Sequence, residues 1–456
     1  MSPNLLTSTR DLAQVAADLL NRANGCGATD ADVIVGDSET FSVQVRLSAI
    51  DRLTKAREKR LGLRVFFGKR SASSSTSEFA KESLDRFVSD TCALAQAVVE
   101  DEVSGLPDGD LMAKDLPDLS LYDPTVLSTE TQIELARRAE ASAQAEDSRI
   151  TNSEGAEFSS MAGRMVLANT RGFLGEYRSS SFSVSVSPIA TDPDSGAMQR
   201  DAWYAVQRHY ARLDSPEAVG REAARRTLRR LGARKIPTQR APVVFDPEMA
   251  GSLLANLSSA VSGYALYKGA SFLIGQLGNP IASELVTIYD DGRMPGGLGS
   301  RPFDGDGLPT RKTTVVDRGV LRNYLLDTYS ARKLGLASTG NASRGVGENP
   351  SVSPTNLYLV PGTPDPSDII RSVRQGLYVT ELIGFGVNMV TGDYSRGVAG
   401  LWIENGELAY PVEEVTIAGN LKRIFADIDM VGSDLEFRGR IASPTIRVSE
   451  MTIAGN

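Results

Sequence analysis

Histidine and cysteine are nearly absent from this 456-residue chain, which has one histidine and two cysteines. A zinc finger needs four such ligands close together and the zinc-peptidase helix motif needs two histidines, so Cys26, Cys92 and His209 cannot supply either. Two cysteines cannot staple a chain of this length, and their scarcity favours a reducing, cytoplasmic location. His209 lies in a predicted strand with polar neighbours. We interpret it as a surface or hydrogen-bonded histidine and not as the base of a catalytic triad.

Long apolar runs are also missing. No stretch of about 18 apolar residues occurs, so we expect no membrane span. The first ten residues lack a basic segment followed by an apolar core, so we expect no signal peptide. The net charge of −8 argues against general nucleic-acid binding, which requires a basic field. Hydrophobic residues make up 41% of the chain and charged residues 23%, which is typical of a globular protein with substantial cores.

The order of the predicted elements favours an α+β fold over a regular βαβ alternation. Apolar residues at helical spacing predict helices over 11–24, 78–100, 129–146 and an arginine-rich 215–235. Alternating or β-rich segments predict strands over 31–35, 41–47, 61–67, 155–170, 180–188 and 198–211. Ile236-Pro237 then breaks the helical pattern. We therefore divide the chain into a mixed α/β N-terminal domain over 1–238 and a second domain over 239–456.

The second domain is predicted to be β-rich, with one helix at about 246–261. Asp246 would cap that helix and Pro247 would occupy its first position. The rest of this domain's sequence predicts short strands separated by glycine-rich turns, a pattern typical of a sandwich or barrel-like sheet. The predicted strands are 284–290, 312–319, 321–327, 356–360, 381–390, 397–404, 407–418 and 445–454.

Three loops of the second domain, 302–307, 340–345 and 391–397, combine turn-forming residues with charged or aromatic side chains. Such loops commonly hold functional side chains over a cleft, although their side chains can equally satisfy the backbone of a tight turn. Our candidate substrate- or partner-facing residues are Asp304, Asp306, Arg344, Glu381, Asp393, Tyr394 and Arg396. A hydrolase that uses Asp304, Glu381 or Asp393 as acids is a further hypothesis, but no pair of them has catalytic spacing.

Several segments of the second half resemble the TldD/TldE (PmbA) family, the "modulator of DNA gyrase" proteins. The first is Phe-Asp-Pro-Glu-Met-Ala-Gly-Ser-Leu-Leu at 245–254. The resemblance continues at 301–310, 319–335, 391–395, 403–407, 411–414 and 449–455. It is specific over about 240–456 and looser before that, where 61–68 is the best matching piece.

The resemblance implies two types of subunit. The TldD type carries His-Glu-x-x-x-His on the helix after Phe-Asp-Pro-Glu, and a cysteine near the C-terminus completes its zinc site. Zinc held by three protein ligands acidifies a bound water, and the glutamate accepts the proton. Here Ala255 and Ala260 stand where the two histidines would be, Asn256 replaces the glutamate, and 430–434 offers no cysteine. The chain is therefore similar to the TldE/PmbA type, which lacks the metal motif.

The resemblance implies a non-catalytic subunit of a cytoplasmic TldD–TldE heterodimer, a zinc metallopeptidase that acts on unfolded peptides and small peptide precursors. We then expect no catalytic residue and no cofactor in this chain, with zinc only in a TldD-type partner. An extended peptide substrate could add to a free sheet edge. The alternative is a stand-alone modulator that binds peptides or a gyrase- or toxin-related protein without catalysis. Such a modulator could be a homodimer.

Overall fold

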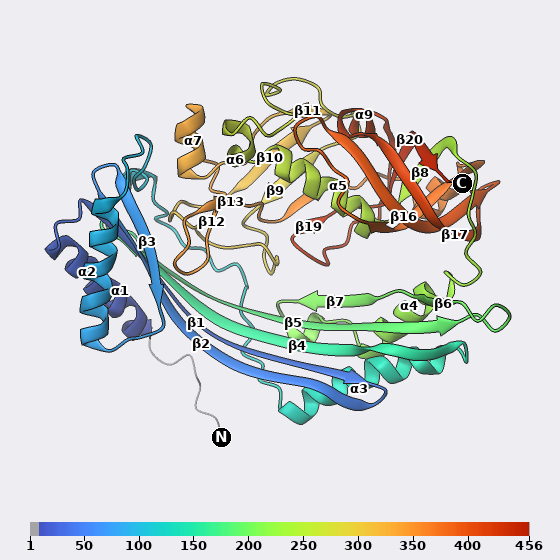
Figure 1. The fold of residues 1–456 in the computed structure, drawn as a ribbon, viewed down its shortest axis with the longest axis horizontal. Coiled ribbons are helices and arrows are strands. Elements are labelled where there is room, and N and C mark those ends of the chain that lie inside the picture. The colour runs from blue at the N-terminus through green and yellow to red at the C-terminus, as the bar shows by residue number, and fades with distance from the viewer. Residues whose placement is uncertain (1–8, 456) are drawn as a thin grey trace.

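The computed structural model describes residues 9–455, and its N-terminal half is built around one long curved antiparallel sheet (Figure 1). The strand order is β3-β2-β1-β4-β5-β6, and β7 also pairs with β5. The strands are β1 (Asp30–Arg46), β2 (Ala49–Phe67), β3 (Arg70–Thr76), β4 (Ile150–Asn169), β5 (Leu174–Thr191), β6 (Met198–Arg200) and β7 (Trp203–Gln207). The helices of this half are α1 (Thr9–Gly25), α2 (Lys81–Ala97), α3 (Thr129–Glu146) and α4 (Pro216–Leu228).

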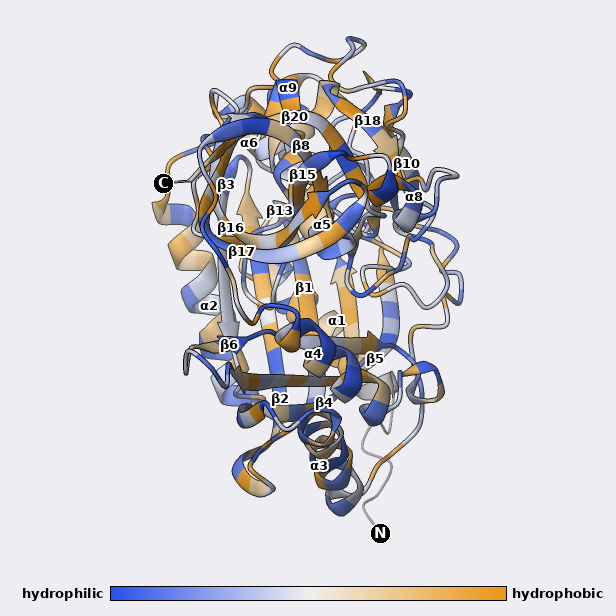
Figure 2. Ribbon diagram, turned by 90° about the vertical axis from the view of Figure 1, so that its right-hand side faces the viewer, coloured by the Kyte–Doolittle hydropathy of each residue, from blue (hydrophilic) through white to orange (hydrophobic). Residues whose placement is uncertain are grey.

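The two faces of this sheet have different neighbours because side chains along a strand alternate between faces. On β1, Val33 and Val35 pack in a core with α1 and α2, whereas Phe41 and Val43 pack with α3 and α4. All four helices therefore cover the same face. Ile34 points the other way and packs with Phe303 of the second half. Figure 2 shows the hydrophobic segments concentrated on the strands, while the outer helix α3 is largely hydrophilic.

The second half lies over the opposite face of the long sheet and contains a closed barrel (Figure 1). Five strands close it in the order β17-β16-β15-β8-β20, with β17 pairing back to β20 and β18 adding to β20. A second sheet has the order β11-β10-β9-β14-β19, and β12 pairs with β13. The five barrel strands are β8 (Gln239–Phe245), β15 (Gln375–Ile383), β16 (Asp393–Glu404), β17 (Glu407–Asn420) and β20 (Ile446–Ala454), and the added strand is β18 (Ile428–Val431). The others are β9 (Ile288–Asp291), β10 (Lys312–Asp317), β11 (Val320–Leu321), β12 (Ala342–Ser343), β13 (Ser351–Val352), β14 (Leu357–Leu359) and β19 (Ile441–Ala442).

The helix predicted at 246–261 is α5 (Pro247–Ala260), and Asp246 caps it by accepting a hydrogen bond from the Met249 amide at 2.9 Å. It packs inside the main core of the second half. The expectation of one helix in this half is wrong, because the structure also has short helices at α6 (Gly263–Tyr267), α7 (Thr328–Leu334), α8 (Pro366–Arg371) and α9 (Leu421–Ala426). Helices of five to seven residues are too short to show a helical period.

The α+β class and the barrel-like second half are confirmed. Several predicted elements differ from the structure. Of the strand expected over 321–327 only β11, Val320–Leu321, is present, and the strand expected over 381–390 is the end of β15, which stops at Ile383. The strand expected over 198–211 is broken into β6, β7 and a single 3-10 turn, so His209 lies just after a strand and not inside one. The helix expected over 215–235 ends at Leu228 and continues as turns. Within residues 9–455, no helix is long and apolar enough to cross a membrane.

Candidate functional site

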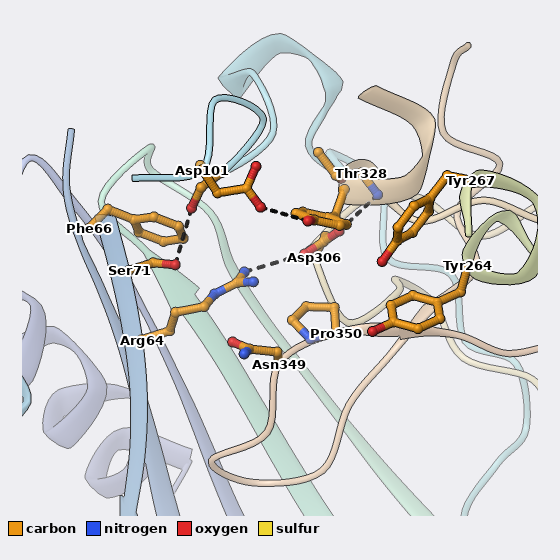
Figure 3. A pocket seen from close by; sticks show the side chains of 13 residues that line it. Arg64, Phe66, Ser71, Asp101, Tyr264, Tyr267, Asp306, Thr328, Asn349 and Pro350 are labelled. Atoms are coloured by element: carbon orange, nitrogen blue, oxygen red, sulfur yellow. Dashed lines mark hydrogen bonds and ion pairs between the residues drawn. The ribbon is translucent and has the colours of Figure 1, made fainter. Parts of the chain in front are cut away.

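A cavity of about 300 Å³ lies between the end of the long sheet and the second half of the chain (Figure 3). The first half contributes side chains from β2 and β3 and the segment 101–105. The second half contributes α6, the start of α7 and two loops. The lining residues are Arg64, Phe66, Ser71, Asp101, Ser104, Gly105, Tyr264, Tyr267, Asp306, Thr328, Tyr329, Asn349 and Pro350. Both halves are therefore needed to form it.

Four buried charges join the two halves beside this cavity. Asp32 of β1 accepts hydrogen bonds from Arg64 Nε at 2.9 Å and from Arg344 Nη1 at 2.8 Å. Arg64 also pairs with Asp306 at 3.3 Å. All four side chains are at most 10% exposed. Burial alone would raise the pKa of Asp32, but Arg344 and Arg64 more than offset it, so the pKa is lowered and the carboxylate is charged.

Two of the three loops chosen from the sequence meet at this place. The amide of Gly305 donates to the carbonyl of Ala342 at 2.8 Å, and Asp304 accepts from the Ala342 amide at 3.1 Å. Asp304 is 2% exposed and also accepts from the amides of Asp306 and Leu308. Its contacts hold the turn at 304–308 and join that turn to the loop at 340–345.

Burial raises the pKa of Asp304 to about 7, and the neighbouring carboxylate of Asp306 adds to the rise. An aspartate in the unfolded chain titrates near pH 3.9, so the folded state binds this proton more tightly. The resulting stability is fully present below about pH 4 and is lost as the pH rises through about 7, a change of about 2–4 kcal/mol. We expect the free energy of unfolding of the Asp304→Asn variant to depend less on pH than that of the parent. Urea unfolding at several pH values between about 5 and 8 measures this, and parallel pH profiles of the two proteins would contradict it.

The third loop, at the start of β16, lies elsewhere. Asp393 is exposed and bonds to Thr391 and Asn420, whose hydrogen bonds lower its pKa. Tyr394 is 2% exposed and points into the barrel core, where burial raises its pKa to about 12. Arg396 donates to the carbonyl of Ile383 at 3.3 Å. These contacts hold the hairpin together, and none of them reaches the cavity.

Glu381 of β15 joins the two halves at another point, where it pairs with Arg230 at 2.6 Å. Nearby, Tyr204 of β7 donates to Glu248 at the start of α5 at 2.9 Å. His209 follows β7, and its Nε2 lies 2.8 Å from the Ser120 carbonyl, in keeping with a hydrogen-bonded histidine. The pairs of Glu381 with Arg230 and of Tyr204 with Glu248 tie β7 and the segment after α4 to the barrel domain, whereas His209 bonds within the first half. They do not form a cluster with Asp304 or Asp393.

The cavity residues that sequence reasoning missed come mainly from strands and from short helices. Tyr264 and Tyr267 on α6 stack edge to face at 5.1 Å, and Tyr329 on α7 lies 5.8 Å from Tyr267. Tyr329 donates to Asp101 at 2.6 Å, which joins α7 to the first half. The spacing Tyr264-x-x-Tyr267 was the one local signal, since residues three apart share a helix face.

Models of three domains of one family match this chain in order. They are described as PmbA/TldA metallopeptidase domain 1 over 31–95, the central domain over 122–231 and the C-terminal domain over 238–455. The chain is also 38% identical to a metalloprotease PmbA of Escherichia coli O157:H7, over 97% of this chain and 96% of that protein. The chain belongs to the PmbA/TldD family.

Other members of the PmbA/TldD family support the same assignment. A metalloprotease TldD homolog of Haemophilus influenzae is 27% identical over 72% of this chain and 73% of its own length. A putative modulator of DNA gyrase from Bacteroides thetaiotaomicron superposes with a TM-score of 0.91 at 28% identity, over 98% of this chain and all of that one. TldE of Thermococcus kodakarensis has the same fold, with a TM-score of 0.85 at 20% identity, over 97% of this chain and all of that one.

TldD-type motifs place zinc ligands and a base at three positions of α5. The residues that this chain has at those positions cannot bind a metal. Ala255 and Asn256 are half-buried on α5, and Ala260 is fully buried. Neither alanine has a donor atom, and an amide does not act as a carboxylate base. In the described part of the chain, no three His, Cys, Asp or Glu side chains are grouped so that they could hold a metal ion.

Proposed function

We propose that this chain is the non-catalytic, PmbA/TldE-type subunit of a cytoplasmic two-subunit metallopeptidase whose zinc lies in a TldD-type partner. The observation that carries the proposal is the substitution of all three motif positions on α5 by Ala255, Asn256 and Ala260 in an otherwise intact family fold. Matches to both PmbA-named and TldD-named proteins are consistent with two paralogous types of subunit.

In this proposal the chain supplies shape and not chemistry. Its half of the complex would help to enclose unfolded peptides and small peptide precursors, while the partner's metal site performs hydrolysis. The closed barrel leaves no free edge in its ring of five strands, and in this proposal an extended peptide adds to an edge of the long sheet. The outer part of β2 offers such an edge, since β3 pairs only with residues 61–67.

The test is reconstitution with the His-Glu-x-x-x-His paralogue from the same genome. We expect the full chain, purified with a tag that has no histidine, to hold no stoichiometric zinc and to cleave no unfolded polypeptide. Mixing it with the paralogue should form a heterodimer and produce cleavage. A paralogue whose metal-site glutamate is replaced by glutamine is the matched control, since it retains the partner but loses the base.

Metal analysis, size-exclusion chromatography with light scattering and peptide cleavage measure these three outcomes. Zinc-dependent cleavage by the chain alone would contradict the proposal. A homodimer that never pairs with the paralogue would instead favour the alternative, a stand-alone modulator without catalysis. Two solved structures with this fold are named as putative modulators of DNA gyrase, which is the reason for retaining that alternative.

A further inference from the structure

The interdomain cavity has hydrogen-bond donors along one wall. Arg64 uses Nε and Nη2 for Asp32 and Asp306, and no described residue bonds to its Nη1. Asn349 lies beside it, because its Oδ1 accepts from Ser73, and Ser73 is the β3 neighbour of Arg64 in the sheet register. The Nδ2 of Asn349 has no bonding partner among the described residues either. Two donors on one wall suit a carboxylate.

An acceptor lies next to these donors. Asp306 is 6% exposed and lines the same cavity, and its two bonds are long, 3.3 Å to Arg64 and 3.2 Å to the Thr328 amide. Its oxygens therefore retain capacity for a further donor. The Thr328 hydroxyl is buried and has no hydrogen-bond partner among residues 9–455. Figure 3 shows the Arg64 guanidinium pointing toward Asp306, so opposite charges meet at one point of the cavity.

The far wall of the cavity is aromatic. Figure 3 shows Tyr264 and Tyr267 across the cavity from Arg64, and they stack edge to face at 5.1 Å. Aromatic rings pack favourably against other rings and against the apolar part of a ligand. The charges in and beside the cavity are balanced, since Arg64 and Arg344 pair with Asp32 and Asp306 in one network, and Asp101 of the lining pairs with Lys333 at 3.0 Å. A ligand with a net charge would disturb this balance, whereas a neutral zwitterion would not.

We propose that this cavity binds the zwitterionic head of a free α-amino acid with an aromatic side chain. The carboxylate would bond to Arg64 Nη1 and Asn349 Nδ2, the ammonium group to Asp306, and the side chain would lie against Tyr264 and Tyr267. An α-amino acid carries its ammonium and carboxylate groups on the same carbon atom, which matches the adjacent Arg64 and Asp306. A longer peptide separates its terminal charges and does not match. The volume of about 300 Å³ lies at the lower end of the range for small-molecule sites.

The inference goes beyond the proposed function, because the site lies within this chain and requires neither a partner nor a metal. Free amino acids are the end products of peptide hydrolysis, so the site would allow a peptidase subunit to respond to product. A bound amino acid would also contact both halves of the chain, since Arg64 belongs to the first half and Asp306 to the second.

Isothermal titration calorimetry of the full chain alone with L-phenylalanine tests the inference. We expect a dissociation constant between about 0.1 and 1 mM. L-phenylalaninamide lacks the carboxylate and N-acetyl-L-phenylalanine lacks the ammonium group, and each should bind at least about tenfold more weakly. Absence of heat and of any rise in melting temperature at about 10 mM L-phenylalanine would overturn the inference, as would binding of either derivative as tight as that of L-phenylalanine.

Two variants locate the binding site. Tyr264→Ala and Asn349→Ala remove side chains that are at the surface of the chain, and each should weaken binding at least about fivefold. Tyr358→Ala is the matched control, because Tyr358 and Tyr289 form a similar ring pair at 5.8 Å beside Lys312, away from the cavity. Binding that is unchanged in both cavity variants, with parent-like melting temperatures, would overturn the inference whether or not the chain pairs with a TldD-type subunit.

Discussion

Replacing Asp32 by alanine is expected to lower the free energy of unfolding by about 3–5 kcal/mol, the usual cost of leaving a buried charge without its partner. Asp32 is 2% exposed and pairs with both Arg64 and Arg344. Its removal leaves two buried guanidinium groups with Asp306 as the remaining acid, and only Arg64 bonds to Asp306. Because the arginines come from different halves of the chain, the loss should also loosen the contact between the halves.

Urea unfolding of the parent and the variant measures the change. Asp37→Ala is the matched control on the same strand, since Asp37 pairs with Arg57 at 2.9 Å but that arginine is 45% exposed. An ion pair near solvent is worth about 0–1 kcal/mol, so the control should remain close to the parent. Equal losses in the two variants would mean that burial of the network contributes nothing to stability.

Much of the fold could be predicted because its elements carry local signals. The helix α5 has Asp246 as cap and Pro247 at its first position, and α3 has Ser128 as cap, followed by regular apolar spacing. Closure of the barrel carries no such signal. It depends on the pairing of β17 with β20, where Ile417 faces Ile453. The residue pattern within a strand does not predict which distant strand will pair with it.

The candidate site could be predicted only in part, for a similar reason. Asp306 and Arg344 stood out because they lie in glycine-rich loops. Their partners could not be found, since Arg64 is 242 residues from Asp306 and Asp32 is 312 residues from Arg344. A single charged residue in a strand has the same local pattern whether it faces solvent or a buried ion pair. Asp393 was chosen on loop composition, and its contacts serve only its own hairpin and the neighbouring Asn420.

The second large effect concerns the α5 positions where the metal motif is missing. Ala260 is 0% exposed in the main core of the second half, and its carbonyl accepts a hydrogen bond from Ser271 at 2.6 Å. Ala260→His would replace a methyl group by an imidazole ring with two polar nitrogens in that packed space. We expect a loss of about 2–4 kcal/mol from overpacking and from burying unpaired polar atoms. Ala255→His is the control, because Ala255 is only half-buried, and its cost should be below about 1 kcal/mol.

The comparison decides whether the core leaves room for a histidine at the position where TldD-type motifs have one. If it leaves no room, the variant carrying Ala255→His, Asn256→Glu and Ala260→His together should gain no thermal stability when zinc is added, because a ligand stabilises only a folded state that binds it. Differential scanning calorimetry with and without zinc measures this. A clear rise in melting temperature with zinc, or an Ala260→His variant as stable as Ala255→His, would show that the fold has room for a metal ligand at this position.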